Sequence, residues 1–245
     1  MTRLSVNINK IALIRNSRGS NLPDLKQVSL DCERFGAQGI TVHPRPDERH
    51  IRYDDIPILK KVVSTEFNIE GNPTEKFLSM VEKHQPHQVT LVPDAPGALT
   101  SDSGWDTITH LHKLRDIVQR MHHVGVRVSI FLNPELKMVE GAKEVGTDRI
   151  EFYTGDYAKS YKEDREKAIS PFVEAALLAN QVGLGINAGH DLNLENLNFF
   201  QHKIPNLLEV SIGHALVTDA LYNGLQNTIK MYLHELQRPV DIYVP

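Results

Sequence analysis

Cysteine, long apolar runs and basic blocks are nearly absent from this chain of 245 residues, and each absence excludes a class of protein. Cys32 is the only cysteine, so no disulfide can form within the chain, and a reducing cytoplasm is the expected location. The first residues, MTRLSVNINK, lack the apolar core of a signal peptide, and no run approaches the roughly 20 apolar residues of a membrane span. The net charge of -4 and the lack of a basic block argue against nucleic acid as a partner.

What the chain has throughout its length is a repeated pattern of strand followed by helix. Segments with helical spacing of apolar residues separate eight short runs rich in β-branched and apolar residues. These runs lie at 3–9, 39–45, 67–71, 88–94, 127–133, 149–155, 184–190 and 209–215. Such alternation indicates parallel strands, and eight units favour an α/β fold of the (β/α)₈ TIM-barrel type with additional helices. An open doubly wound sheet is the alternative, but NINKIALIRNSRG lacks its Gly-rich phosphate turn.

The pattern also predicts the domain organisation. No Pro/Gly/Ser linker, shift of composition or low-complexity tract interrupts the chain, so residues 1–245 are expected to form a single barrel domain. The connections 10–23 and 94–105 are longer than a minimal barrel needs, which predicts extra helices or lids there. Asn72-Pro73 is expected to begin a helix, and the apolar stripe from Val217 to Leu236 predicts one final helix.

Polar residues gather where the predicted strands end, and the active site of such a barrel lies at that end. The residues at these positions are Asn7, Asn9, Lys10, His43, Arg45, Glu70, Asp94, Thr100, Asn133, Glu151, Asn187, His190, Gly213 and His214. Glu70 follows three strand residues, so burial is expected to raise its pKa and suit it to proton transfer. Structural ion pairs for Glu70 and Glu151, and packing roles for the histidines, remain the alternative interpretation.

Two other kinds of catalytic centre have weaker support. Zinc hydrolases of this fold often carry His-x-His at the end of the first strand, where this chain has Asn-Ile-Asn. The one His-x-His, at 110–112, falls on a predicted helix, so no metal is expected. A Schiff-base lysine is also disfavoured, because only the first strand ends near a lysine.

Phosphate binding has better support. Barrels often hold phosphate with backbone N–H groups after strands seven and eight, and these loops begin NAGHD and SIGHA. Arg45 and His50 offer a second cationic pocket, which Arg18 could reach from the first loop. Two anion sites at one mouth predict a substrate with two phosphates or two phosphorylated substrates.

Six stretches together resemble one family, that of pyridoxine 5′-phosphate synthase in the deoxyxylulose-dependent vitamin B6 pathway. They are VNINKIALIRNSRG, GITVHPRPDERHI, NIEG, IEFYTGDYA, INAGHDL and SIGHALV, and the similarity runs in order from about residue 4 to residue 235. The resemblance implies a (β/α)₈ barrel with additional helices that assembles as a homo-octamer. It implies a transferase-class, ring-closing condensation of 3-amino-2-oxopropyl phosphate with 1-deoxy-D-xylulose 5-phosphate. The products are pyridoxine 5′-phosphate, inorganic phosphate and water, and no cofactor or metal is needed.

The resemblance also implies a role for each site residue. Proton transfer falls on His43, Glu70 and His190, while Glu151 stabilises a transition state. Deoxyxylulose phosphate contacts fall on Asn9, Lys10, Arg45, His50 and Thr100, and aminooxopropyl phosphate contacts on Asn7, Arg18, Asp191, Gly213 and His214. Three positions depart from the family pattern, which has an acid and a His at Asn9 and Lys10 and a Gly at Asp191; altered contacts are expected there.

Two other functions stay open at this point. A sugar-phosphate isomerase or aldolase on the same barrel would use Glu70 as the enolising base. A non-catalytic regulator that binds phosphorylated metabolites would bind its ligand without forming a product.

Overall fold

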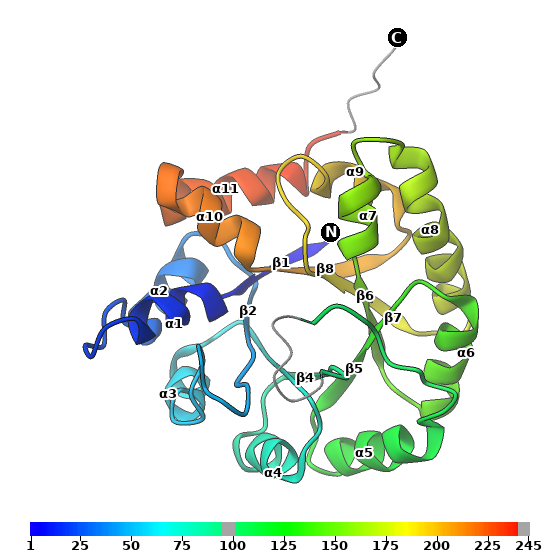
Figure 1. Ribbon diagram of the computed structural model, residues 1–245, viewed down its shortest axis with the longest axis horizontal. Coiled ribbons are helices and arrows are strands. Elements are labelled where there is room, and N and C mark those ends of the chain that lie inside the picture. Colours follow the sequence, from blue (N-terminus) through cyan, green and yellow to red (C-terminus); the bar gives the residue numbers. More distant parts are fainter. Residues whose placement is uncertain (95–100, 240–245) are drawn as a thin grey trace.

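The computed structural model describes residues 1–94 and 101–239, and its strands form one closed barrel. All eight strands are parallel and pair in chain order, with β1 closing against β8 (Figure 1). The strands are β1 (Arg3–Asn7), β2 (Gly39–Val42), β3 (Glu66–Gly71), β4 (Gln88–Leu91), β5 (Arg127–Leu132), β6 (Arg149–Tyr153), β7 (Gly185–Gly189) and β8 (Leu207–Ile212). Each overlaps one of the eight predicted runs, and the predicted (β/α)₈ barrel is confirmed.

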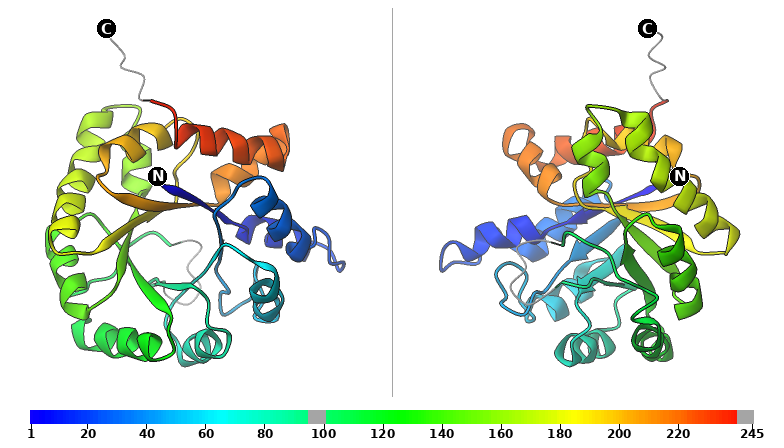
Figure 2. Two further views of the ribbon diagram at one scale, coloured as in Figure 1. Left: turned by 180° about the vertical axis from the view of Figure 1, so that it is seen from behind. Right: turned by 45° about the vertical axis from the view of Figure 1, so that its right-hand side comes forward.

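Helices form a ring outside the strands, as Figures 1 and 2 show. They are α1 (Asn9–Asn16), α2 (Leu25–Arg34), α3 (Asp55–Val62), α4 (Glu75–His84), α5 (Leu111–His123), α6 (Leu136–Val145), α7 (Gly155–Ser160), α8 (Arg165–Gln181), α9 (Leu197–Lys203), α10 (His214–Asn223) and α11 (Leu225–Glu235). The helices α1 and α7 lie in the loops after β1 and β6, in addition to the regular ring. Among the described residues, no helix combines the length and apolar character needed to span a membrane.

The barrel interior is polar, which bears directly on the site above it. Thr90 in β4 donates a hydrogen bond to Glu151 in β6 over 3.2 Å, and because these two strands are not paired, the bond crosses the interior. Asn68 accepts from the Thr90 hydroxyl at 3.1 Å and donates to Thr41 at 3.4 Å. Bonded polar side chains at this depth avoid the cost of burying unpaired groups, and they give the carboxylate of Glu151 a fixed support.

Two predicted helices differ from the structure. The stripe from Val217 to Leu236 forms α10 and α11 instead of one helix, because Gly224 between them adopts φ = 74°, which ends a right-handed helix. The helix expected at Asn72-Pro73 begins at Glu75 instead. Thr74 caps it by accepting a hydrogen bond from the Phe77 N–H at 3.3 Å.

The N-terminal end of the barrel holds a buried ionic cluster that the sequence analysis did not foresee. Glu66 accepts a hydrogen bond from Arg127 and lies 3.1 Å from Arg3 and 3.8 Å from Arg149. Burial raises the pKa of Glu66, but the bond from Arg127 and the three guanidinium charges outweigh it and hold that pKa below its usual range. Glu209 lies in the same cluster, where burial, followed by the charges of Glu66 and Glu151, raises its pKa to about 8.

Candidate active site

The C-terminal ends of β1, β2 and β3 bring three predicted residues together. The Asn7 side-chain amide donates to Glu70 Oε2 over 3.5 Å, and His43 Nδ1 lies 3.9 Å from that same oxygen. Since β1 and β3 are not paired, the Asn7–Glu70 contact spans the mouth of the barrel. An amide, an imidazole and a carboxyl group therefore share one small space.

His43 is held in place through its backbone. Its N–H donates to Asn9 Oδ1 at 2.9 Å, and the Asn9 N–H donates to Asn7 Oδ1 at 3.1 Å. Asn9 and Lys10, expected at a strand end, are the first two residues of α1. His43 is 5% exposed, and burial, followed by the positive charge of Arg45, lowers its pKa well below the usual value. A neutral imidazole is able to accept a proton.

Glu70 has the opposite protonation state. Burial raises its pKa well above the usual value, and the nearby carboxylates of Glu151 and Asp94 raise it further. A carboxyl group in this setting stays protonated near neutral pH and is able to donate a proton. His43 and Glu70 thus form a neutral base and a neutral acid at one rim.

Glu151 lies deeper in the barrel and is 3% exposed. Burial raises its pKa to about 7, against the lowering effects of the hydrogen bond from Thr90 and of His190. Gly189 at the end of β7 covers the carboxylate so closely that a Cβ on this glycine would overlap Glu151 Oε1. The carboxylate position therefore depends on the absence of a side chain at residue 189.

Replacing Gly189 with alanine is expected to lower kcat by about 100-fold, because displacing a catalytic group by about 1 Å has an effect of that order. Steady-state kinetics measure the loss of kcat, and a thermal melt measures any loss of stability. Gly141→Ala is the matched control, since its Cβ in α6 would overlap Thr107, a residue with no assigned role in the site. It should reduce stability and leave kcat unchanged; equal losses of kcat in both variants would contradict the assignment.

His190 lies beside Glu151 in an unusual backbone conformation. Its φ of 79° is in the left-handed region, which non-glycine residues adopt at a cost of roughly 1–3 kcal/mol and which often marks functional sites. Its Nδ1 lies 2.9 Å from Asp191 Oδ2, and its ring packs edge-on against Tyr153 at 5.2 Å. The hydrogen bond with His190 is the main cause that lowers the pKa of Asp191, so this carboxylate is ionised and directed at the imidazole.

Arg45 and His50 form the cationic side of the mouth. Burial, followed by the charges of Arg45 and Lys10, lowers the pKa of His50 to about 4. The Ile51 N–H donates to His50 Nδ1 at 2.9 Å, so the neutral ring carries its proton on Nε2. The two imidazoles of His43 and His50 lie 6.2 Å apart, edge to face.

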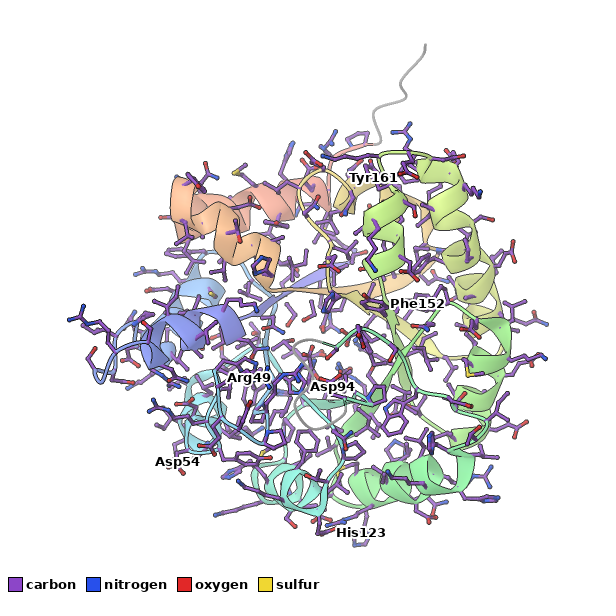
Figure 3. The ribbon with its side chains drawn as sticks, viewed as in Figure 1. Arg49, Asp54, Asp94, His123, Phe152 and Tyr161 are labelled. Atoms are coloured by element: carbon purple, nitrogen blue, oxygen red, sulfur yellow. The ribbon has the colours of Figure 1, made fainter. Side chains whose placement is uncertain are left out.

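Asp94 is a member of this site to which the sequence analysis gave no role. Its Oδ2 lies 2.7 Å from an Arg45 guanidinium nitrogen, 3.9 Å from His43 Nε2 and accepts from the Ser101 hydroxyl at 2.8 Å. Figure 3 shows Asp94 over the middle of the barrel, between the strand ends. A carboxylate directly after VP at the end of a buried strand was the available signal. The guanidinium expected to meet a phosphate thus already faces an internal anion.

The remaining predicted residues lie at separate points around the mouth. Gly213 packs against Asn7, because a Cβ added to this glycine would lie only 3.1 Å from the Asn7 Cβ. His214 is the first residue of α10. Arg18 lies in the exposed turn after α1. Thr100 falls outside the described residues. Within residues 1–94 and 101–239, no three His, Cys, Asp or Glu side chains are arranged to hold a metal ion.

Comparison with known proteins identifies the family. Residues 4–238 match the family described as pyridoxal phosphate biosynthesis protein PdxJ. The chain belongs to this family. Pyridoxine 5′-phosphate synthase of Cytophaga hutchinsonii is 62% identical to it over 97% of this chain and 100% of that protein. The synthase of Parabacteroides distasonis is also 62% identical, over 95% of this chain and 98% of that protein.

Membership in the PdxJ family makes the chain an enzyme, and the resemblance seen in its sequence motifs is confirmed. Two solved structures of low sequence identity share the fold of this PdxJ chain, and their likeness shows the fold alone. Phosphoribosylanthranilate isomerase from Thermotoga maritima superposes with a TM-score of 0.60 at 14% identity, over 98% of this chain and all of that one. The 3-keto-L-gulonate-6-phosphate decarboxylase from Vibrio cholerae gives 0.66 at 9% identity, over 97% and 98%.

Proposed function

We propose that the enzyme is a pyridoxine 5′-phosphate synthase. It condenses 3-amino-2-oxopropyl phosphate with 1-deoxy-D-xylulose 5-phosphate, and it forms pyridoxine 5′-phosphate, inorganic phosphate and water. The observation that carries the proposal is the pairing of a neutral base, His43, with a protonated carboxyl group, Glu70, whose oxygen lies 3.9 Å away. A condensation that repeatedly removes and returns protons beside a carbonyl or imine needs such a pair.

The two substrates are assigned to two sides of the mouth. Deoxyxylulose phosphate is assigned to residues of α1 and of the loop after β2, together with Thr100, which lies outside the described residues. Aminooxopropyl phosphate is assigned to residues of β1, of the turn after α1, and of the segments after β7 and β8. The first set is Asn9, Lys10, Arg45, His50 and Thr100, and the second is Asn7, Arg18, Asp191, Gly213 and His214. The guanidinium of Arg45 and the Nε2–H of neutral His50 support the first assignment, because both donate hydrogen bonds to phosphate oxygens.

Two of the three departures from the family pattern, Asn9 and Asp191, have a structural explanation. The Asn9 side chain already accepts from the His43 N–H, so its amide holds the catalytic histidine as well as facing the substrate. The Asp191 carboxylate is turned to His190, and its backbone N–H is the group assigned to the phosphate.

The first half of the reaction joins the substrates. The amine of aminooxopropyl phosphate attacks the ketone of deoxyxylulose phosphate, Glu70 protonates the developing oxygen and water leaves to give an imine. His43 then removes a proton from the adjacent carbon. The electron pair released there expels the hydroxyl of the next carbon as water and leaves an enol. Loss of the enol proton then pushes electrons through the new double bond and expels the terminal phosphate as inorganic phosphate. Water adds to the unsaturated carbon left behind, which gives the hydroxymethyl group and a new enol.

The second half closes the ring. The nucleophilic carbon of that enol attacks the ketone of the aminooxopropyl unit. His190 transfers the proton that the new hydroxyl needs before water leaves. Glu151 stabilises the positive charge of the transition state as a carboxylate. Loss of the last protons gives the aromatic ring, and no oxidant is consumed because every step is an addition or an elimination.

The pKa of Glu151 predicts a pH dependence. Since a raised carboxyl pKa keeps Glu151 protonated below about 7, kcat should rise as the pH increases through that value. A kcat profile from pH 5 to 9 should show this ascending limb, and Glu151→Gln should lower kcat and remove it. Glu209→Gln, a buried carboxyl replacement at the other end of the barrel, should keep it. An unchanged limb in Glu151→Gln would assign the titration to another group.

The decisive experiment supplies each phosphorylated substrate alone and then both together. A synthase releases inorganic phosphate and fluorescent pyridoxine phosphate only with both present. An isomerase or aldolase, the alternative on the same barrel, would convert one substrate alone, and a regulator would bind without product. We further propose that residues 1–245 form one domain, which limited proteolysis tests. We also propose a homo-octamer, which gel filtration with light scattering tests, and a cytoplasmic location, which cell fractionation tests.

A further inference from the structure

Arg15 is a buried charge that the proposed chemistry does not use. It is the largest of the fully buried side chains and its side chain is 2% exposed. Its guanidinium forms two hydrogen bonds to Asp55, the first residue of α3, at 2.6 and 2.9 Å. A buried charge is retained at a cost unless it is fully paired, so this fork joins α1 firmly to α3.

The next residue, Asn16, holds the loop between β2 and α3. Its amide nitrogen lies within hydrogen-bond distance of three successive carbonyl oxygens, those of Glu48 at 3.3 Å, Arg49 at 3.1 Å and His50 at 2.7 Å. Arg15 adds a bond to the His50 carbonyl at 3.1 Å, and its Nε donates to Asn16 Oδ1 at 3.0 Å. Side chains of α1 therefore satisfy three carbonyls of a segment that belongs to no strand or helix.

This loop carries Arg45 and His50, the cationic side of the mouth. Its backbone includes a strained conformation. Glu48 adopts φ = 52°, and its N–H closes a turn onto the Arg45 carbonyl at 2.9 Å. Such a conformation persists only where surrounding contacts hold it. Asp55 adds one more contact, since its second oxygen accepts from the Arg52 N–H at 2.8 Å.

We propose that Arg15, Asn16 and Asp55 are positioning residues that shape the 45–50 turn, so that Arg45 and His50 are directed at one substrate phosphate. The three residues do not touch the substrate. Their effect passes through the carbonyl of His50, whose backbone sets where the Nε2–H points. This proposal rests on the proposed function only for the identity of the phosphorylated substrate.

Kinetics with each substrate tests the proposal. Asn16→Ala removes the amide group that faces three carbonyls. KM for deoxyxylulose phosphate should therefore rise about tenfold, an effect of the size of one lost hydrogen bond. KM for aminooxopropyl phosphate and kcat should change much less. Asn16→Asp keeps the shape but not the donors, and should behave like alanine. If alanine at this position prevents folding, Asp55→Asn, which removes the charge and one of the two accepting oxygens of the fork, should give the same selective rise.

Matched controls separate positioning from general stability. Arg120→Gln breaks a similar guanidinium fork to Glu75 and Glu82 on the outer surface, and should leave both KM values unchanged. A lower melting temperature with unchanged KM for deoxyxylulose phosphate in Asn16→Ala and Asn16→Asp would overturn the proposal, and so would equal rises for both substrates.

Calorimetric binding of inorganic phosphate gives a test that does not depend on turnover. Arg45→Gln identifies the part of the binding heat that belongs to the cationic pocket, and Asn16→Ala should weaken that part about tenfold. If the wild-type enzyme bound phosphate but made no pyridoxine phosphate, the proposed function would be wrong. The phosphate-binding measurement would still test whether Asn16 positions the cationic pocket. Unaltered phosphate affinity in Asn16→Ala would overturn the positioning itself.

Discussion

Replacing Glu70 with glutamine is expected to lower kcat by about 10²–10⁴-fold, the usual contribution of a well-placed acid or base. Glutamine keeps the size of the side chain and can still accept the hydrogen bond from Asn7, but it has no proton to give. Because burial raises the pKa of Glu70 well above its usual value, the neutral amide is a close match for the carboxyl group. Steady-state kinetics with both substrates, together with circular dichroism and a thermal melt, measure the two expectations.

The proper comparison for this variant is Glu209→Gln. Both carboxyl groups are buried with raised pKa values, but Glu209 lies in the ionic cluster at the other end of the barrel. Loss of activity in both variants would indicate a general effect of altering buried carboxyl groups. Near-normal turnover of Glu70→Gln alone would remove Glu70 from the mechanism.

Replacing Glu66 with glutamine is expected to lower the free energy of unfolding by about 3–5 kcal/mol, since one partner of a buried ion pair is lost and the other is left uncompensated. The Glu66 side chain is 6% exposed and faces the guanidiniums of Arg127, Arg3 and Arg149. Urea denaturation at pH 7 measures the change. Glu75→Gln is the control, because its carboxylate is 74% exposed and its bonds to Arg120 compete with water.

The sign of the pH effect distinguishes this explanation from lost packing. The folded-state pKa of Glu66 is lowered, so its contribution is present above its unfolded pKa and is lost as the pH falls through the folded value. The difference between wild type and Glu66→Gln should therefore shrink in acid. A difference that stays constant down to pH 3 would indicate packing instead of charge.

The barrel could be predicted because its information is local and repeated. Each strand is a short apolar run, and each is followed by a helical stripe, so the count of eight was visible without any contact between distant residues. The break at Gly224 was harder to see, since an apolar stripe continues across it with little change of phase. A positive φ at one glycine decides between one helix and two, and periodicity does not report it.

Most of the acid–base groups could be placed for a related reason. Parallel strands in a barrel bring their C-terminal ends to one rim, so a polar residue at such an end is near the others whatever its number. The structure brings His43, Glu70 and Asn7 together in this way, and Glu151 and His190 beside one another. The assigned roles of these residues remain predictions.

Two features depended on three-dimensional pairing and could not be read from the sequence. Asp94 follows β4 by three residues, and its ion pair with Arg45 connects the loop after β4 to the loop after β2. The cluster around Glu66 uses residues at the starts of strands, which carry no functional expectation in this fold. Charge partners that are far apart in the chain leave no periodic signal.

The close approach of Gly189 to Glu151 links two positions that are 38 residues apart in sequence and lie on adjacent strands. A homologue that gained a side chain at position 189 would have to shorten, move or lose the acid at position 151. Among homologues, positions 189 and 151 should therefore vary together or both stay unchanged.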